Sequence, residues 1–348
     1  MEKIRLGKTE MMVSRLGFGG IPIQRVSEGE AVAVVKRCLE LGINFIDTAN
    51  GYSTSEERIG KAILGQREGV FLATKSGART REDMEKHLQQ SLKQLGVNYI
   101  DLYQFHGVSD PKHLEMVLAP DGLMTVVEEA KKAGVVKHIG VTSHSMDIAK
   151  EAVVSNRFET IMFPFNFITC EAADELLPLA REHDVGFIAM KPLAGGMLDN
   201  AAIAFKYLFQ YPDIIPIPGI ERIEEIEEIV RLLEGPVQMS ETEQHEMKRL
   251  IEELGTRFCR RCNYCQPCSE EIPISMVMTS SSFFKRLPEE RFFSGMFADA
   301  IEKAANCTQC GECEARCPYH LPIREILTEQ LKWIQEEKKK YQERQSVR

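Results

Sequence analysis

Short hydrophobic runs alternate with longer amphipathic segments from the start of the chain to about residue 235. The runs have the length of buried strands, and the segments between them repeat hydrophobic residues with the period of a helix. The predicted strands are 13–18, 43–48, 70–75, 100–106, 138–142, 160–165, 186–191 and 214–218. Eight strand–helix units in succession favour a (β/α)8 TIM barrel in the α/β class.

Helix-boundary signals support this alternation. Ser27 and Glu30 form a capping-box pattern before a stripe of hydrophobic residues, and Thr80 begins a helical pattern that ends at Gly96. A doubly wound open sheet is the alternative fold. The chain has no G-x-G-x-x-G motif between a strand and a helix to support that alternative.

The barrel pattern stops near Gly235 and Pro236, and the composition of the chain then changes. Ser240 and Glu243 cap one more helical segment, which ends at Gly255. A cysteine-rich region follows, and the last part of the chain has the pattern of an amphipathic helix. We therefore predict a barrel over residues 1–238, a helical connector over 239–256 and a small, mainly helical domain over 257–348.

Charge and hydropathy exclude several classes of function. The net charge of the 348 residues is −9, whereas proteins that bind nucleic acid present basic stripes. No apolar run approaches the ~20 residues of a membrane span. The first residues lack the apolar core of a signal peptide. We expect a cytoplasmic protein that binds neither nucleic acid nor membrane.

Eight of the ten cysteines lie in two runs near the C-terminus, and in a reducing compartment such runs indicate metal ligands. The later run has the C-x2-C-x2-C-x3-C-P spacing of a bacterial ferredoxin. Its cysteines are Cys307, Cys310, Cys313 and Cys317. The earlier run has a last gap one residue shorter and no following proline. Its cysteines are Cys259, Cys262, Cys265 and Cys268.

Eight thiolates suffice for two [4Fe–4S] clusters, with the fourth cysteine of each run serving the other cluster. The helical pattern between the runs is similar to a helical dicluster ferredoxin. Zinc is the competing interpretation, since a zinc site with four cysteine ligands uses two C-x2-C pairs. Such a site needs neither a third cysteine at the same spacing nor a C-x3-C-P ending.

Ionisable side chains stand at or just after the ends of three successive predicted strands. Asp47 ends one strand and Tyr52 follows it, Lys75 ends the next strand, and His106 ends the third. The active site of a (β/α)8 barrel lies at the carboxyl ends of its strands, so we expect these four side chains to meet. The alternative is that each has an ordinary structural role, as a helix cap, a surface residue or a packed polar residue.

The stretch DTANGYSTSEERIG, residues 47–60, resembles the signature of the aldo-keto reductases, with Lys75 and His106 at the expected following strand ends. The resemblance covers roughly residues 1–235. It implies that a nicotinamide hydride reduces a small carbonyl compound. Tyr52 would protonate the developing alkoxide, Lys75 would stabilise the phenolate, Asp47 would hold Lys75, and His106 would orient the carbonyl or share the proton.

The resemblance also implies where a nicotinamide would bind, although many residues differ from the family pattern. Methionines replace the glutamine and tyrosine that contact the nicotinamide, and Gly219 and Glu225 occupy the approximate places of the Lys and Arg that clasp a 2′-phosphate. Glu225 near a ribose favours NAD(H) over NADP(H). The implied residues are Thr142, Ser143, Met162, Met190, Lys191, Pro192, Leu193, Gly219 and Glu225.

The whole chain resembles an aldo-keto reductase subgroup with a C-terminal ferredoxin-like domain. A nicotinamide transfers two electrons together and a cluster transfers one, so joining them usually needs a flavin, for which the sequence has no motif. Three hypotheses follow. The clusters exchange electrons with the barrel site or a redox protein; or an ordinary NAD(P)H reductase carries structural or redox-sensing clusters; or the barrel is a non-catalytic binding module.

Overall fold

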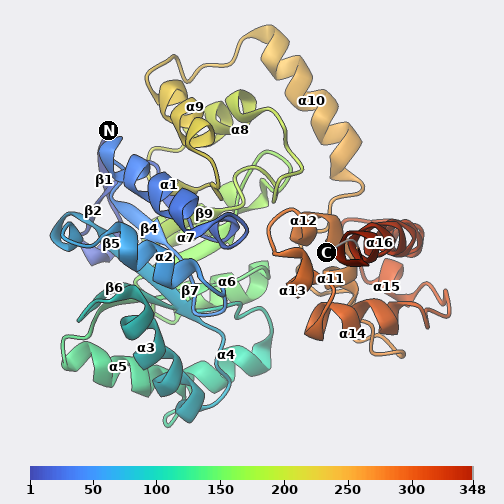
Figure 1. The fold of residues 1–348 in the computed structure, drawn as a ribbon, viewed down its shortest axis with the longest axis horizontal. Helices are drawn as coiled ribbons and strands as arrows, with labels where there is room; N and C mark the ends of the chain where they lie inside the picture. The colour runs from blue at the N-terminus through green and yellow to red at the C-terminus, as the bar shows by residue number, and fades with distance from the viewer. Residues whose placement is uncertain (347–348) are drawn as a thin grey trace. The chain divides into compact units, whose positions relative to one another are not determined.

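The computed structural model describes residues 1–346 of a chain that divides into two compact units, Met1–Glu243 and Gln244–Arg348. In the first unit, eight parallel strands follow one another in chain order around a sheet (Figure 1). The strands are β3 (Phe18–Gly19), β4 (Phe45–Asp47), β5 (Phe71–Ser76), β6 (Ile100–Phe105), β7 (Val136–Thr142), β8 (Thr160–Pro164), β9 (Gly186–Met190) and β10 (Ile214–Ile217). This architecture confirms the predicted (β/α)8 barrel.

The sheet closes between its first and last strands. The backbone N–H of Gly17 donates to the Pro216 carbonyl over 2.9 Å, and that of Gly19 donates to the Pro218 carbonyl over 2.8 Å. A Cβ atom on Gly19 would lie 2.8 Å from that same Pro218 oxygen. The closure therefore requires the close backbone approach that glycine permits.

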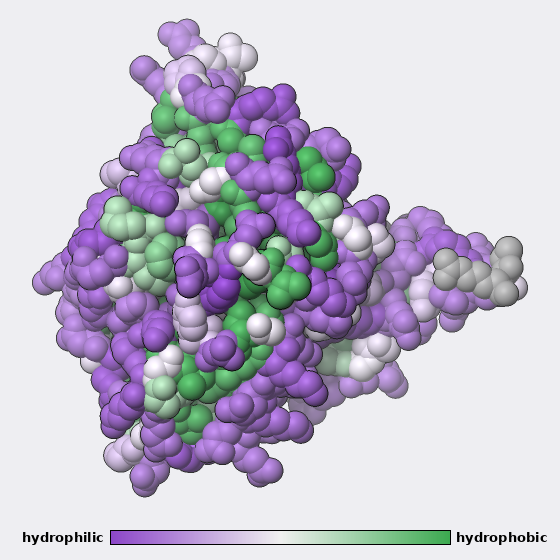
Figure 2. Space-filling view, turned by 60° about the vertical axis from the view of Figure 1, so that its left-hand side comes forward, coloured by the Kyte–Doolittle hydropathy of each residue, from purple (hydrophilic) through white to green (hydrophobic). Residues whose placement is uncertain are grey.

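Nine helices lie along the sheet of the first unit as the structure describes it. Their hydrophobic stripes pack on the outside of the strands in one continuous core. They are α1 (Glu28–Glu40), α2 (Ser55–Ala62), α3 (Arg81–Leu95), α4 (Pro111–Leu118), α5 (Leu123–Lys132), α6 (Met146–Val154), α7 (Leu176–Glu182), α8 (Ala201–Leu208) and α9 (Ile223–Leu233). The face in Figure 2 is mainly hydrophilic, and hydrophobic residues appear as a band between hydrophilic ones. The predicted caps are present, Ser27 before α1 and Thr80 before α3.

The first predicted strand, 13–18, is wrong in its extent. Residues Met12–Ser14 form β2, which pairs antiparallel with β1 (Lys3–Arg5), and only Phe18–Gly19 belongs to the barrel. Leu6, Met11 and Val13 of this hairpin region pack with the side chains inside the barrel. The hydrophobic run is thus shared between two sheets, which the pattern along the chain does not distinguish.

The second unit is helical, and α10 (Glu241–Gly255) leads into it. Its helices are α11 (Ile274–Met278), α12 (Ser280–Phe284), α13 (Glu289–Phe292), α14 (Gly295–Ala304), α15 (Glu312–Ala315) and α16 (Ile323–Ser346). One core gathers Cys265, Cys313 and Cys317 with aliphatic side chains, and a second packs Phe283, Phe292 and other aromatic side chains. Within residues 1–346 no helix has the length and apolar character needed to cross a membrane.

Candidate active site and cysteine sites

A buried ion pair joins the carboxyl ends of β4 and β5. Lys75 Nζ lies 2.6 Å from Asp47 Oδ2 and donates a second hydrogen bond of 2.6 Å to the Thr48 carbonyl. The two residues are only 1% and 3% exposed. Burial opposes the charge of Lys75, but Asp47 and Tyr52 outweigh that cost, and the pKa of Lys75 lies above its ordinary value. Lys75 is therefore a fixed cation at this end of the barrel.

Tyr52 and His106 lie beside this cation. A turn in which the Tyr52 N–H donates to the Ala49 carbonyl holds Tyr52 just before α2. The rings of Tyr52 and His106 meet edge to face with centroids 5.8 Å apart, and Lys75 Nζ lies 5.0 Å from the Tyr52 centroid. Both rings remain partly exposed. The structure thus brings together all four side chains that the sequence singled out.

Gln104 and Glu56 belong to the same surroundings and were missed in the sequence. Gln104 Nε2 donates to Asp47 Oδ1 over 3.1 Å, so both oxygens of that carboxylate have donors. The Thr74 hydroxyl donates to Glu56 Oε1 over 2.6 Å, and burial raises the pKa of Glu56. The sequence feature that could have identified Gln104 is its amide side chain in the otherwise hydrophobic end of residues 100–105.

The arrangement couples a partly exposed proton donor to a buried cation. Tyr52 can donate a proton to a molecule at the mouth of the barrel, and Lys75 stabilises the phenolate that remains. On the loop between Asp47 and Tyr52, Asn50 Nδ2 is buried and has no partner within residues 1–346.

The residues predicted to hold a carboxamide have other hydrogen-bond partners in the structure. Thr142 Oγ1 accepts from the Gly107 N–H over 2.8 Å, and the Ser143 hydroxyl donates to the Ser145 carbonyl over 3.2 Å. Met162 lies inside the barrel and is 1% exposed. Met190, at the end of β9, packs on the same interior cluster and is partly exposed.

The loop after β9 carries Lys191, Pro192 and Leu193. It turns back at once, since the Ala194 N–H donates to the Lys191 carbonyl over 2.9 Å. Lys191 and Leu193 are partly exposed and Pro192 is buried. These three residues therefore lie directly beyond Met190 at the carboxyl end of the barrel.

Gly219 and Glu225 lie at the beginning of the α9 region. Gly219 is exposed, and a Cβ atom there would come within 2.8 Å of Pro22 Cγ. Glu225 Oε2 accepts from the backbone N–H groups of Glu221 and Arg222 over 3.0 and 3.2 Å, so its carboxylate caps α9. The exposed Arg222 side chain pairs with Glu225 over 2.8 Å. Arg222 thus places a cation near Gly219 and Glu225, the positions where the resemblance to the family indicated no Lys or Arg.

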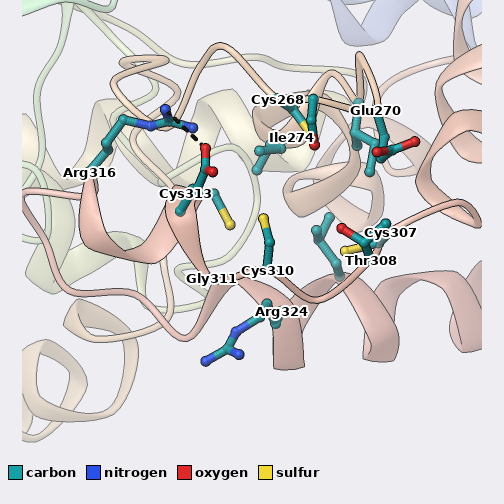
Figure 3. Close-up of a pocket in the computed structure, with 14 residues that line it drawn as sticks. Cys268, Glu270, Ile274, Cys307, Thr308, Cys310, Gly311, Cys313, Arg316 and Arg324 are labelled. Carbon is teal, nitrogen blue, oxygen red and sulfur yellow. Dashed lines mark ion pairs between the residues drawn. The ribbon is translucent and has the colours of Figure 1, made fainter.

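The eight clustered cysteines form two sets of four, each lining one cavity. The first set is Cys259, Cys262, Cys265 and Cys317, around a cavity of about 20 Å³. The second set is Cys268, Cys307, Cys310 and Cys313, also around about 20 Å³. Figure 3 shows the sulfur atoms of Cys310 and Cys313 pointing into the second cavity. Each set therefore takes three cysteines from one run and the fourth from the other.

In the described part of the chain, no three His, Cys, Asp or Glu side chains are close enough together to hold a metal ion. Burial, with the neighbouring Cys259 and Cys262, raises the pKa of Cys265 to about 12. Of the two isolated cysteines, Cys38 is buried in α1 and Cys170 is exposed.

Comparison with known proteins assigns the barrel. The model of the aldo/keto reductase family matches residues 15–202. The uncharacterised oxidoreductase YqkF of Bacillus subtilis is 31% identical over 212 residues, which are 57% of this chain and 67% of that protein. The L-galactose dehydrogenase of Arabidopsis thaliana is 29% identical over 212 residues, which are 56% and 66% of the two chains.

Solved structures agree. The holo form of the aldo-keto reductase AKR11C1 from Bacillus halodurans superposes with a TM-score of 0.62 at 26% identity, over 72% of this chain and 96% of that one. A Klebsiella pneumoniae aldo/keto reductase in complex with NADP and acetate shares the fold, with a TM-score of 0.61 at 21% identity over 72% and 95%. Since the family model spans more than half of the chain, this protein belongs to the aldo/keto reductase family of oxidoreductases.

Proposed function

We propose that the barrel reduces a small carbonyl compound with a nicotinamide cofactor, and that the second unit holds two [4Fe–4S] clusters. The clusters would exchange electrons with the barrel site or with a redox protein. The observation that carries the catalytic part is the contact of Tyr52 with both His106 and the Lys75–Asp47 ion pair. The reducing cytoplasm is the compartment that suits such clustered thiols.

Each of the four side chains has a different role in the protonation of an alkoxide. Tyr52 donates the proton to the carbonyl oxygen, and Lys75 stabilises the phenolate by its positive charge. Asp47, fixed by Lys75 and Gln104, prevents the lysine from swinging toward the substrate. His106 is a partly exposed polar group that can orient the carbonyl group.

A bound nicotinamide would supply the hydride for this reduction. The side chains at the ends of β7 to β9 are better suited to packing on the face of the nicotinamide ring than to hydrogen bonding with its amide. Met190 offers a partly exposed, polarisable side chain, whereas the hydroxyls of Thr142 and Ser143 already have partners. Family membership supports this cofactor, and the Klebsiella relative holds NADP.

The preference between NAD(H) and NADP(H) depends on the start of α9. We retain NAD(H), because the start of α9 presents no excess positive charge to a 2′-phosphate: the carboxylates of Glu225 and Glu221 pair with Arg222 and Arg25. Arg222 is the opposing feature. Replacing Arg222 by Ala should leave the KM for NADH unchanged. If the parent protein uses NADPH efficiently and the replacement greatly raises the KM for NADPH, the preference is for NADP(H) instead.

The two cysteine sets support clusters rather than zinc. In a [4Fe–4S] cluster each thiolate binds a different iron atom, so the four sulfurs stand at the corners of a larger group than one zinc ion. Both cavities collect four cysteines, and both take the fourth from the other run, as in two-cluster ferredoxins. When bound, the clusters would supply one-electron transfer.

The catalytic proposal is tested by replacing Tyr52 with Phe. Reduction of a panel of small aldehydes and ketones by NADH and NADPH should fall by about 10²–10⁴-fold, the usual contribution of a general acid. Tyr99→Phe is the matched control, because its ring stacks on Arg67, 4.1 Å away, and the stacking survives without the hydroxyl. Equal rates for the two variants would refute the assignment of Tyr52.

The cluster proposal is tested by metal analysis of anaerobically purified protein. Two clusters predict roughly eight iron atoms and eight sulfides per chain. Stoichiometric zinc without iron would refute it.

A further inference from the structure

The two cysteine sets differ in their contact with solvent. In the first set, Cys265 and Cys317 are 8% and 7% exposed, and the other two cysteines are partly buried. In the second set, only Cys313 is buried, and Cys310 is openly exposed. The loop beside it adds Thr308 and Gln309, both exposed. Solvent therefore reaches the second set directly and the first set much less.

The side chains around the two cavities differ less. Aliphatic residues line both cavities: Ile274, Met278, Leu321 and Ile323 in the first, and Ile272, Ile274 and Leu327 in the second. Arg260, Asn263 and Ser275 also line the first cavity, and Arg260 stacks on the neighbouring Tyr319 ring at 4.0 Å. The second cavity has more charged and hydroxyl side chains, among them Glu270, Thr308, Arg316 and Arg324 (Figure 3).

Specific donors and charges also reach the second set. Gln309 Nε2 lies 3.7 Å from Cys307 Sγ and can donate to it. Together with Arg316, Arg324 lines the cavity. Its guanidinium is fixed by Glu314 at 2.7 Å and by the Gln309 carbonyl at 3.3 Å.

These differences act on the reduction potential of a cluster. Reduction adds one negative charge to a group that is already anionic, so water and N–H donors to sulfur favour it, and apolar burial opposes it. The charges that line the second cavity balance, because Arg316 and Arg324 stand beside Glu270 and Glu312. Solvent contact and the Gln309 donor are therefore the features that distinguish the second set. Building on the function proposed above, we propose that Cys268, Cys307, Cys310 and Cys313 hold the higher-potential cluster and that electrons are exchanged there with a one-electron carrier. In that step the carrier loses one electron and the cluster gains it, and no bond forms or breaks.

The order of potentials is tested by EPR-monitored redox titration of the full-length protein loaded with clusters. Two separate midpoints are expected. Arg324→Gln removes the cation from the second set alone, so the higher midpoint should fall by about 59 mV, a tenfold change in a one-electron equilibrium. Arg324→Lys should restore most of it. Arg260→Gln, which affects the first cavity alone, should move only the lower midpoint.

Gln309→Ala is the second variant, because this exposed side chain can be removed without breaking an ion pair. It should lower the same midpoint as Arg324→Gln, by less. A single shared midpoint, or an Arg324→Gln shift confined to the lower midpoint, would overturn the proposed order.

The exchange point is tested with a paramagnetic dysprosium chelate in solution. It should accelerate the spin relaxation of the higher-potential signal more than that of the lower. Equal acceleration, or the reverse order, would overturn the exchange point. Absence of iron from the protein would instead overturn the cluster proposal on which this inference rests, so the two failures are distinguishable.

Discussion

The barrel site and the cysteine sites differ in what holds them together. At the end of the barrel, Lys75 and Asp47 satisfy one another, and Thr48 and Gln104 supply further hydrogen bonds to them from within the protein. In the second unit, four thiols surround each cavity, and within the described residues none of them forms a disulfide. The first site is therefore organised by the fold, whereas we expect the second unit to be organised by what binds to its cysteines.

Removing iron should have the largest effect of the changes considered, and it should affect only the second unit. Anaerobic chelation should speed amide exchange over residues 259–317 by about 100-fold or more, the effect of losing a ligand present at 100 times its dissociation constant. Exchange in β4 to β6 should not change. The single tryptophan, Trp333, lies 5.4 Å from Phe284 in the second unit, so its fluorescence offers an independent measurement. Unchanged exchange over 259–317 would show that the fold alone organises the cysteines.

Breaking the barrel ion pair should have the next largest effect. Lys75→Met leaves the Asp47 carboxylate buried without its counter-charge and should lower the free energy of unfolding of the first unit by about 3–5 kcal/mol. Adding Asp47→Asn should recover much of the loss. Urea-dependent amide exchange in β4 and β5 measures both. Lys61→Met, at an exposed ion pair with Glu57, is the control and should change little.

Gln104→Leu should have a smaller effect in the same region. It removes one donor to a charged carboxylate, and such hydrogen bonds contribute about 1.5–3 kcal/mol. The same exchange measurement should show destabilisation of β4 and β6 with no change in residues 259–317. A leucine variant as stable as the parent would mean that Lys75 alone satisfies Asp47.

Acid should act on the barrel through Glu159, with the smallest effect. Burial opposes its charge, but His138, Lys131 and the Ile139 N–H outweigh it and lower the pKa of Glu159 to about 2. Since the folded pKa is below the ordinary 4.5, this stabilisation is present above pH 4.5 and is lost as the pH falls toward 2. Stability measured from pH 6 to 3 should depend less on pH in Glu159→Gln. An unchanged slope would contradict the assignment.

The sequence predicted best where a local pattern decides the structure. The strands at 70–75 and 100–106 appear as Phe71–Ser76 and Ile100–Phe105, because a buried parallel strand needs a continuous hydrophobic run. The prediction of one barrel strand over 13–18 was wrong, because the choice between the hairpin and the barrel depends on partner strands elsewhere in the chain. Sequence could not show that Gln104 contacts Asp47, since the contact exists only once the strands stand side by side.

The role of Glu225 also could not be predicted from the sequence. A carboxylate near the start of a helix can cap that helix or contact a ribose, and only the structure shows that it accepts two backbone N–H groups. The cysteine spacing, in contrast, indicated the crossed sharing of the two runs. Each cavity indeed contains one cysteine from the other run.

That crossing constrains the order in which the protein can be completed during synthesis. The first 243 residues form a unit of their own and can fold while the rest is still on the ribosome. Neither cysteine set is complete at that stage, nor when the earlier cysteine run has emerged, because one set needs Cys307, Cys310 and Cys313 and the other needs Cys317. A chain that stops before residue 307 therefore loses both sites together, and a nascent chain with a folded barrel carries four cysteines of incomplete sites until its last segment arrives.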